Sequence, residues 1–282
     1  MLKITLDIFS GLPNPTWTLK GEEAQTVLRE IQNTRGGVSE LDSGTQPLGY
    51  RGFIIETEGT TRGLPSIFRV TSSSSLNETK AREILRKLRN NRSRGEIPTL
   101  PPPDANQPDN TIPESDPETV NPVSRSQSEG QCPFVATKYD PRPWNQLQVI
   151  RRNNCYNYAT RRQTNTFAQP GRISGIDIGK PITARRVIRA ALADGARSVQ
   201  QCLSRSDAPL VMALVIAPDP EFNDFHWYRY HQEGVWGHKP GQTRARNVDN
   251  SGEVIKNPET CDRGSYTQFA GYFFVPRSMK VQ

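Results

Sequence analysis

The first residues of the chain have the alternating pattern of a half-buried strand, with apolar Ile4, Leu6 and Ile8 separated by polar residues. A turn segment rich in Gly, Pro and Asn follows, and then a short strand over residues 16–19. Apolar residues recur at helical spacing from Ala24, residues 52–55 and 67–70 form two further strands, and Asn77 is placed to cap a last helix. We expect a small N-terminal α/β sandwich over residues 1–94.

The second half of the chain has helices first and then a meandering antiparallel sheet. One helix begins near Asn154, and Thr183 caps another. Residues 210–216 are an almost continuous apolar run, which is typical of a strand buried on both faces. We predict a hairpin over residues 225–230 and 235–239, a second turn with flanking strands over residues 248–255, and a final strand over residues 269–276. The expected fold is therefore an α+β domain over residues 131–282.

Residues 95–130 separate these two units. Eight prolines lie between residues 97 and 130 among Asp, Glu, Asn and Ser, and almost no side chain there suits a core. Residues 95–130 carry seven acidic residues and one basic residue, whereas residues 131–282 carry twenty-one basic and twelve acidic residues. We expect an acidic linker that is disordered or polyproline-like.

Composition limits the cellular settings. The 282 residues are enough for two domains that each bury a core, and the mean hydropathy of −0.68 fits a chain with a polar insert. No apolar run is long enough to span a membrane, and the N-terminus lacks a signal-peptide layout. We expect a cytoplasmic protein, or one exported by a route without an N-terminal signal peptide. The four cysteines show no C-x-x-C spacing, so free thiols are expected.

Cys155 is the candidate nucleophile. It follows Asn153 and Asn154, both strong N-cap residues, which places it in the first turn of a helix. Unpaired N–H groups and the helix dipole lower the pKa of a thiol at that position, and Arg151 and Arg152 add positive potential. A histidine within hydrogen-bond reach would complete the activation. The competing interpretation is a packed cysteine between two core tyrosines.

Strand parity separates the three histidines. His226 shares one face of its strand with Tyr228, whereas His231 lies on the opposite face, so the two cannot serve one site. His238 lies near His226 across the hairpin, where it could accept the ring N–H of His226 and hold its tautomer. The sequence therefore selects Cys155, His226 and His238.

This arrangement resembles the papain-like thiol hydrolases, particularly the NlpC-type and CHAP-type amidases. These enzymes place a cysteine at a helix N-terminus, a histidine at the start of a sheet strand and a polar third residue on the next strand. The resemblance covers residues 131–282 and rests on order and on the twelve-residue spacing of the two histidines. It implies that Cys155 is the nucleophile, His226 the base and His238 the orienting residue. The chain lacks the glycine before the histidine and the Asp-Cys pair of that family.

Other residues are open for the remaining roles. Asp249 or Asn250 could be the third member in the manner of papain. The oxyanion hole would use the Cys155 backbone N–H and one donor from Asn145, Gln146 or Gln148, which precede the nucleophile as the family's donor does.

The expected function is a cysteine-dependent amidohydrolase, either a peptidase, a cell-wall amidase or a protein deamidase, with a peptide or protein substrate. We expect no cofactor and no metal, because no short-range ligand pair such as H-E-x-x-H accompanies the three residues. A non-catalytic interaction protein with structural Cys and His is the first alternative, and a weak basic nucleic-acid-binding module is the second. The N-terminal unit is expected to bind a protein partner or to act as a scaffold.

Overall fold

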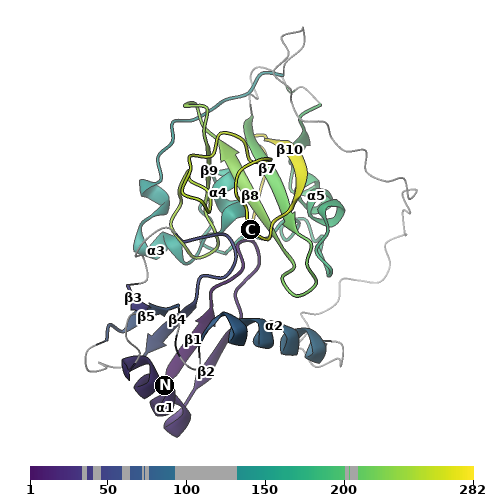
Figure 1. The fold of residues 1–282 in the computed structure, drawn as a ribbon. Helices are drawn as coiled ribbons and strands as arrows, with labels where there is room; N and C mark the ends of the chain where they lie inside the picture. The colour runs from purple at the N-terminus through teal and green to yellow at the C-terminus, as the bar shows by residue number, and fades with distance from the viewer. Residues whose placement is uncertain are drawn as a thin grey trace.

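The computed structural model describes residues 1–33, 37–40, 46–58, 64–71, 73, 76–92, 132–200, 203 and 209–282. These residues form two units, each built on a five-stranded antiparallel sheet with few helices (Figure 1). The predicted α+β class is therefore confirmed. The predicted linker over residues 95–130 lies outside the described residues.

The N-terminal unit follows the predicted order of elements. Its sheet has the strand order β2-β1-β4-β5-β3, and its members are β1 (Leu2–Leu6), β2 (Thr16–Leu19), α1 (Gly21–Asn33), β3 (Val38–Ser39), β4 (Phe53–Thr57), β5 (Ile67–Val70) and α2 (Glu78–Arg92). Strand β3 was not predicted, because two residues are too short to show a period. Asn77 caps α2 as expected, since its side-chain oxygen accepts a hydrogen bond from the Lys80 N–H at 3.0 Å.

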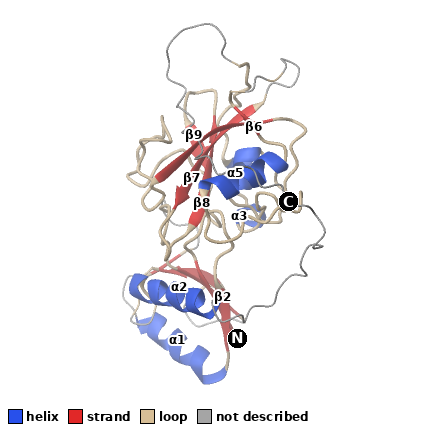
Figure 2. Cartoon of the chain, turned by 90° about the vertical axis from the view of Figure 1, so that its right-hand side faces the viewer, coloured by secondary structure: helices blue, strands red, loops and turns tan. Residues whose placement is uncertain are grey.

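The C-terminal unit has short helices before its sheet. The elements are the 3₁₀ helix η1 (Arg142–Trp144), α3 (Leu147–Ile150), α4 (Cys155–Thr160), α5 (Ala184–Ala193), β6 (Arg197–Ser198), β7 (Leu210–Ala217), β8 (Asp224–Tyr230), β9 (Trp236–His238) and β10 (Gln268–Val275). The strand order is β6-β10-β7-β8-β9, and Figure 2 shows α5 lying across one face of the sheet. The predicted strands over residues 248–255 reduce to one bridge between Val248 and Val254.

The two faces of the C-terminal sheet pack against different parts of the molecule. Residues paired across β7 and β8 share a face, and Leu214 with Trp227 lies on the face covered by α4 and α5. Ala213 with Tyr228 lies on the other face, in a core that also contains residues of the N-terminal unit. Strand β7 is therefore buried on both faces, as its continuous apolar run predicted.

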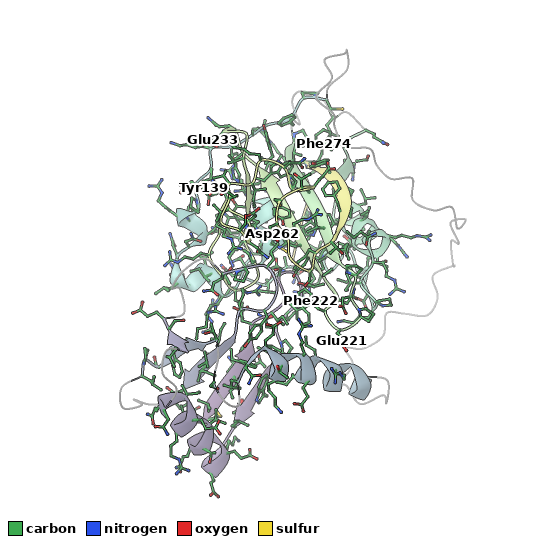
Figure 3. The ribbon with its side chains drawn as sticks, in the orientation of Figure 1. Tyr139, Glu221, Phe222, Glu233, Asp262 and Phe274 are labelled. Carbon is green, nitrogen blue, oxygen red and sulfur yellow. The ribbon has the colours of Figure 1, made fainter. Side chains whose placement is uncertain are left out.

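One hydrophobic core spans both units, which corrects the expectation of two separate cores. Leu6 and Phe9 belong to the same buried cluster as Ala213, Phe222 and Tyr266. The rings of Phe9 and Phe222 stack with centroids 5.7 Å apart. Figure 3 shows Glu221 and Phe222 at the end of the C-terminal unit that faces the N-terminal unit. The sequence pattern did not reveal this sharing, because it reports that a residue is buried and not which residues cover it.

Residues 7–14, which we call the strap, connect the two units. Strand β1 ends at Leu6 and does not include Ile8, because the strap leaves the sheet and enters the C-terminal unit. Gly11 lies so close to β8 that a Cβ atom there would be 2.5 Å from the Phe225 ring. The Asn14 side chain holds the strap in shape by accepting hydrogen bonds from the N–H groups of Ile8 and Phe9.

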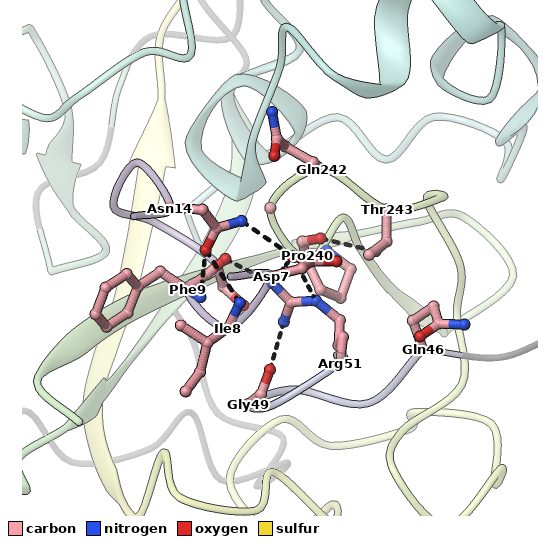
Figure 4. A network of polar contacts seen from close by, with 12 residues as sticks. Asp7, Ile8, Phe9, Asn14, Gln46, Gly49, Arg51, Pro240, Gln242 and Thr243 are labelled. Carbon is pink, nitrogen blue, oxygen red and sulfur yellow. Dashed lines mark hydrogen bonds and ion pairs between the residues drawn. The ribbon is translucent and has the colours of Figure 1, made fainter. Parts of the chain in front are cut away.

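A buried ion network anchors the base of the strap (Figure 4). The Asp7 carboxylate contacts Arg51 and Arg69, each at 2.7 Å, and all three side chains are buried. Burial raises the pKa of Asp7, but the two guanidinium groups outweigh that effect and lower it to about 2. Asp7 is therefore ionised at all physiological pH values.

Candidate functional site

The sequence around Cys155 forms the capped helix start that was predicted. Asn154 is the N-cap of α4, and its side chain accepts hydrogen bonds from the N–H groups of Tyr156 and Asn157. The Asn157 side chain in turn accepts from the Asn154 N–H, which completes a capping box. Cys155 is the first residue of the helix, so the local geometry that favours a thiolate is present.

The Cys155 thiol is nevertheless fully buried. It belongs to the apolar cluster between the sheet and the helices, together with Tyr156, Phe225 and Trp227. Burial, and after it the Asp224 carboxylate, raises the pKa of Cys155 far above its usual value, although backbone N–H groups and Lys239 oppose the shift. The thiol is therefore protonated at neutral pH, and burial keeps a substrate carbonyl away from it.

The structure brings His226 and His238 together but places Cys155 on the other face of the sheet. His226 pairs with Val215 across β7 and β8, and this pair shares the face that meets the N-terminal unit. Cys155 packs on the opposite face beside Trp227. The charged groups that act on the pKa of His226 are His238, Arg246 and Arg51, and Cys155 is not one of them. Strand parity separates the histidines from one another, but it does not report which face of the sheet the helix that begins at Cys155 covers.

The two histidines form a hydrogen-bonded pair. His238 lies opposite Tyr228 in the hairpin, two positions from His226 and within the predicted range of a residue or two, and His226 Nε2 is 2.9 Å from His238 Nδ1. His238 Nε2 is 2.9 Å from the Val248 carbonyl and 3.1 Å from Arg246 Nε. His226 Nδ1 has no hydrogen-bond partner among the described residues.

Two assignments are open to His238 Nε2, because the Val248 carbonyl can only accept and Arg246 Nε, which also reaches that carbonyl, can only donate. We assign Nε2 as the donor to Val248, so that His238 Nδ1 accepts from His226 Nε2. The nitrogen left over, His226 Nδ1, is a bare acceptor. In the reverse assignment His226 Nδ1 would be a buried N–H without an acceptor, which is rarer and more costly than a buried acceptor without a donor. The pair therefore holds two protons on four nitrogens, and three of these nitrogens have structural partners.

Burial lowers the pKa of both histidines well below the usual value, and neighbouring positive groups lower it further. For His226 these groups are Arg246 and Arg51, to which a charge on His238 would add, and for His238 the group is Arg246. His231 lies on the other face, where its Nε2 is 2.9 Å from the Tyr158 hydroxyl, and burial lowers its pKa to about 4. All three histidines are therefore neutral in the folded protein at pH 7.

This state predicts a loss of stability in mild acid. A histidine in the unfolded chain takes up its proton near pH 6.5, whereas the buried histidines of the folded protein stay neutral. Their contribution to the free energy of unfolding is therefore complete above about pH 6.5 and is lost as the pH falls. Each histidine lowers the free energy of unfolding by about 1.4 kcal/mol per pH unit, and three together by about 4. Asp224 acts in the opposite sense, because burial raises its pKa, and Asp7 contributes only near pH 2–4.

Urea unfolding between about pH 7.5 and pH 5 measures this slope. The variant His231→Gln should reduce the slope of the unfolding free energy against pH by the contribution of one histidine. A midpoint that does not change over this range would contradict the neutral assignment.

The other predicted site residues have structural partners. The Asp249 carboxylate closes a turn by accepting from Ser251, Glu253 and Asp262. Asn250 contacts the N-terminal unit, where its side chain accepts from the Leu48 N–H at 2.7 Å. Neither residue therefore orients His226.

The predicted oxyanion donors are also occupied or exposed. The Asn145 side chain bonds both the N–H and the carbonyl of Ala245. Gln146 and Gln148 are exposed and bond each other at 3.0 Å. None of these side chains is bonded to Cys155.

Sequence reasoning missed Asp224, a buried carboxylate at the start of β8. Its oxygens accept hydrogen bonds from the backbone N–H groups of Ser10, Gly11 and Leu12 at 2.6, 3.2 and 3.0 Å. The Tyr266 hydroxyl donates to it as well, at 2.6 Å. The available signal was an acidic residue beginning a largely aromatic strand, where burial of a carboxylate is costly unless it has a specific partner.

Lys239 was missed for a similar reason. Its ammonium group is buried and donates to the carbonyls of Ile150, Asn153 and Gly241, which fixes the loop that leads into α4. Lysine is almost never fully buried without partners, but three backbone carbonyls leave no mark in a sequence.

A groove lies at the junction of the two units. Its volume is about 840 Å³, and its walls are largely apolar, with Phe9, Trp17 and Ile84 on the N-terminal side and Pro181 and Pro220 on the C-terminal side. Among its polar residues, Asn14 and Asn223 are engaged in hydrogen bonds to the backbone. The groove contains neither Cys155 nor a histidine.

Cysteine pairing differs from the expectation. Cys155 and Cys261 are free, but Cys132 is disulfide-bonded, so the prediction of free thiols is wrong for Cys132. Within the described ranges no group of three or more His, Cys, Asp or Glu side chains could hold a metal ion. No helix in the part of the chain that was searched is long and apolar enough to cross a membrane.

The fold and the site together define an α+β protein whose two sheets share a core and whose Cys and His side chains are packed inside it. The chain is 44% identical over 144 residues to insoluble matrix shell protein 1 of Ruditapes philippinarum, a match that covers 51% of this chain and 93% of that protein. The chain belongs to the family of that protein. No family model and no solved structure matches it, so the papain-like resemblance stays a prediction.

Proposed function

We propose that the protein is a non-catalytic structural component of an extracellular matrix. The observation that carries this proposal is the state of the candidate nucleophile. Cys155 is a buried, protonated thiol on the face of the sheet opposite the two paired histidines. Side chains that could be catalytic are instead used to pack and to join the two units.

The family relationship supports the proposal. The relative is named as an insoluble shell matrix protein, and the match covers nearly its whole length. A disulfide at Cys132 is consistent with export, because disulfides persist in oxidising compartments and are rare in the cytosol. We therefore include secretion in the proposed function, in place of a cytoplasmic location.

The competing proposal is the cysteine amidohydrolase acting on a peptide or protein. One observation favours it, namely the capping box that places Cys155 at the first position of α4. The buried thiol and its separation from His226 favour the structural role. A peptidase would require α4 or the strap to move, so that a substrate could reach the sulfur.

Alkylation by iodoacetamide distinguishes the two proposals. In the native protein we expect Cys155 to remain unmodified between about pH 6 and pH 9, because the thiolate is the reactive form and this thiol is buried and protonated. Cys261 is half-buried, and burial raises its pKa to about 11, so it should react slowly and faster as the pH rises. Peptide mass mapping of the wild-type protein follows both residues at once, and a urea-unfolded sample is the control.

The hydrolase predicts a different profile. Cys155 would then react rapidly at about pH 6, with a rate that is flat up to neutral pH and that falls in the variant His226→Gln. That result would overturn the structural proposal. Maleimide labelling of protein taken from its native source, without reduction, tests export separately, since Cys132 should be blocked.

A further inference from the structure

The His226–His238 pair can accept a third proton at only one atom. Three of its four ring nitrogens are bonded to each other or to the Val248 carbonyl, and the remaining one, His226 Nδ1, is buried and has no hydrogen-bond partner among the residues that the structure describes. A proton added there becomes a buried N–H without an acceptor, on a ring that now carries a positive charge. Alternatively the ring must rotate, which breaks its bond to His238.

Positive charges already face this pair. Arg246 lies 3.1 Å from His238 Nε2, and Arg51 of the N-terminal unit also acts on His226. The nearby carboxylates are already paired or capped. Asp7 is bound by Arg51, and the Asp249 oxygens are held by backbone N–H groups. Neither of these two described carboxylates is therefore in position to neutralise a new imidazolium.

The remaining titratable neighbours of the pair are neutral hydroxyl and thiol groups, apart from Asp224. The Tyr228 ring is T-shaped against His226 at 4.8 Å and stacked on His238 at 5.2 Å. The Tyr266 ring lies 5.8 Å from His226. Burial raises the pKa of Tyr228 and Tyr266, and that of Cys261 beside Tyr228, so none of them is ionised near pH 5.

The same neighbours hold the N-terminal unit in place. Arg246 donates to the Gln46 carbonyl, beside the contact between Asn250 and Leu48. Tyr266, which packs on His226, donates to the Asp224 carboxylate that binds the strap. Displacement of Arg246 or Tyr266 by a charged His226 therefore acts directly on both contacts.

We propose that the His226–His238 pair is an acid-sensitive latch, and that a proton taken up at His226 releases the strap and residues 46–51 from the C-terminal sheet while the opposite side of that sheet stays folded. On the opposite face the cluster beside α5 is made of apolar side chains, and His231, the histidine on that face, contacts Tyr158 and Thr137 instead. Asp224 opposes the release, because burial raises the pKa of its carboxyl and proton uptake there favours the folded state, so the release is assigned to the histidine pair. This inference does not depend on the proposed matrix role.

Hydrogen exchange on the full chain tests the latch. After correction for intrinsic rates, we expect the amides of Ser10, Gly11 and Leu12 to exchange about tenfold faster at about pH 5 than at pH 7, whereas amides of α5 change little. The double variant His226→Gln and His238→Gln should lose this response. The matched control His231→Gln, which changes the histidine on the other face, should keep it.

Two results would overturn the proposal. One is a strap whose exchange in the wild type does not respond to pH. The other is a response that persists in the double variant, which would assign it to groups other than the histidine pair. If the double variant does not fold, ¹⁵N spectra of the imidazole nitrogens in the wild type decide. The latch requires the pair to gain its proton at the pH at which strap protection is lost, and protonation near pH 6.5 with the strap still protected would contradict it.

Discussion

Replacing Asp224 with alanine is expected to destabilise the protein by about 4 kcal/mol or more, a loss that few single substitutions cause. The carboxylate accepts three backbone N–H groups of the strap and the Tyr266 hydroxyl, all in a buried environment. Its removal leaves these donors unsatisfied, at about 1–3 kcal/mol each before water enters. Urea unfolding followed by tryptophan fluorescence measures the change.

Two further variants make this result interpretable. Asp224→Asn keeps the volume and one acceptor oxygen, so its loss should lie between that of alanine and the wild type. Asp219→Ala removes an exposed carboxylate that caps the Glu221 N–H, and it should cost no more than about 1 kcal/mol. If Asp224→Ala were as mild as Asp219→Ala, the strap would not depend on this carboxylate.

The second large effect is expected at Asp7. The variant Asp7→Ala leaves Arg51 and Arg69 buried without a counter-charge, and breaking a buried ion pair in this way costs about 3–5 kcal/mol. The loss should shrink in acid below about pH 4, because the wild-type protein is then losing the contribution of its own ionised Asp7. The measurement is the unfolding free energy of both proteins at neutral and at acidic pH.

An exposed ion pair supplies the comparison. Lys80 and Glu83 are 3.0 Å apart on α2 but largely solvated, so Lys80→Ala should change the unfolding free energy by less than about 0.5 kcal/mol. Equal losses at Asp7 and Lys80 would show that burial does not decide the strength of these pairs.

The elements of the fold could be predicted because each has its own period or cap. The alternation at Ile4 and Leu6, the apolar run of β7 and the capping residues Asn77 and Thr183 all produced the expected strands and helices. The strap could not be predicted in this way. Its conformation is determined by Asp224, which is more than two hundred residues away in sequence.

The candidate site shows where local reasoning ends. The helix cap at Cys155 and the pairing of His226 with His238 were both predicted and both occur. The inference that placed Cys155 in one site with the two histidines does not agree with the structure, because they lie on opposite faces of the sheet. Whether a helix N-terminus meets the even or the odd side chains of a strand depends on the face against which the helix packs, and no local pattern reports that face.

The shared core has a consequence for the order in which the protein matures. The strap is synthesised more than two hundred residues before Asp224 and Tyr266, which hold it. On a ribosome the N-terminal sheet must therefore wait with Phe9 and its neighbours uncovered until Tyr266 has emerged. Contacts of such long sequence separation close slowly, and the waiting segment is exposed to aggregation in the meantime. The strap is thus made long before the residues that give it its final structure.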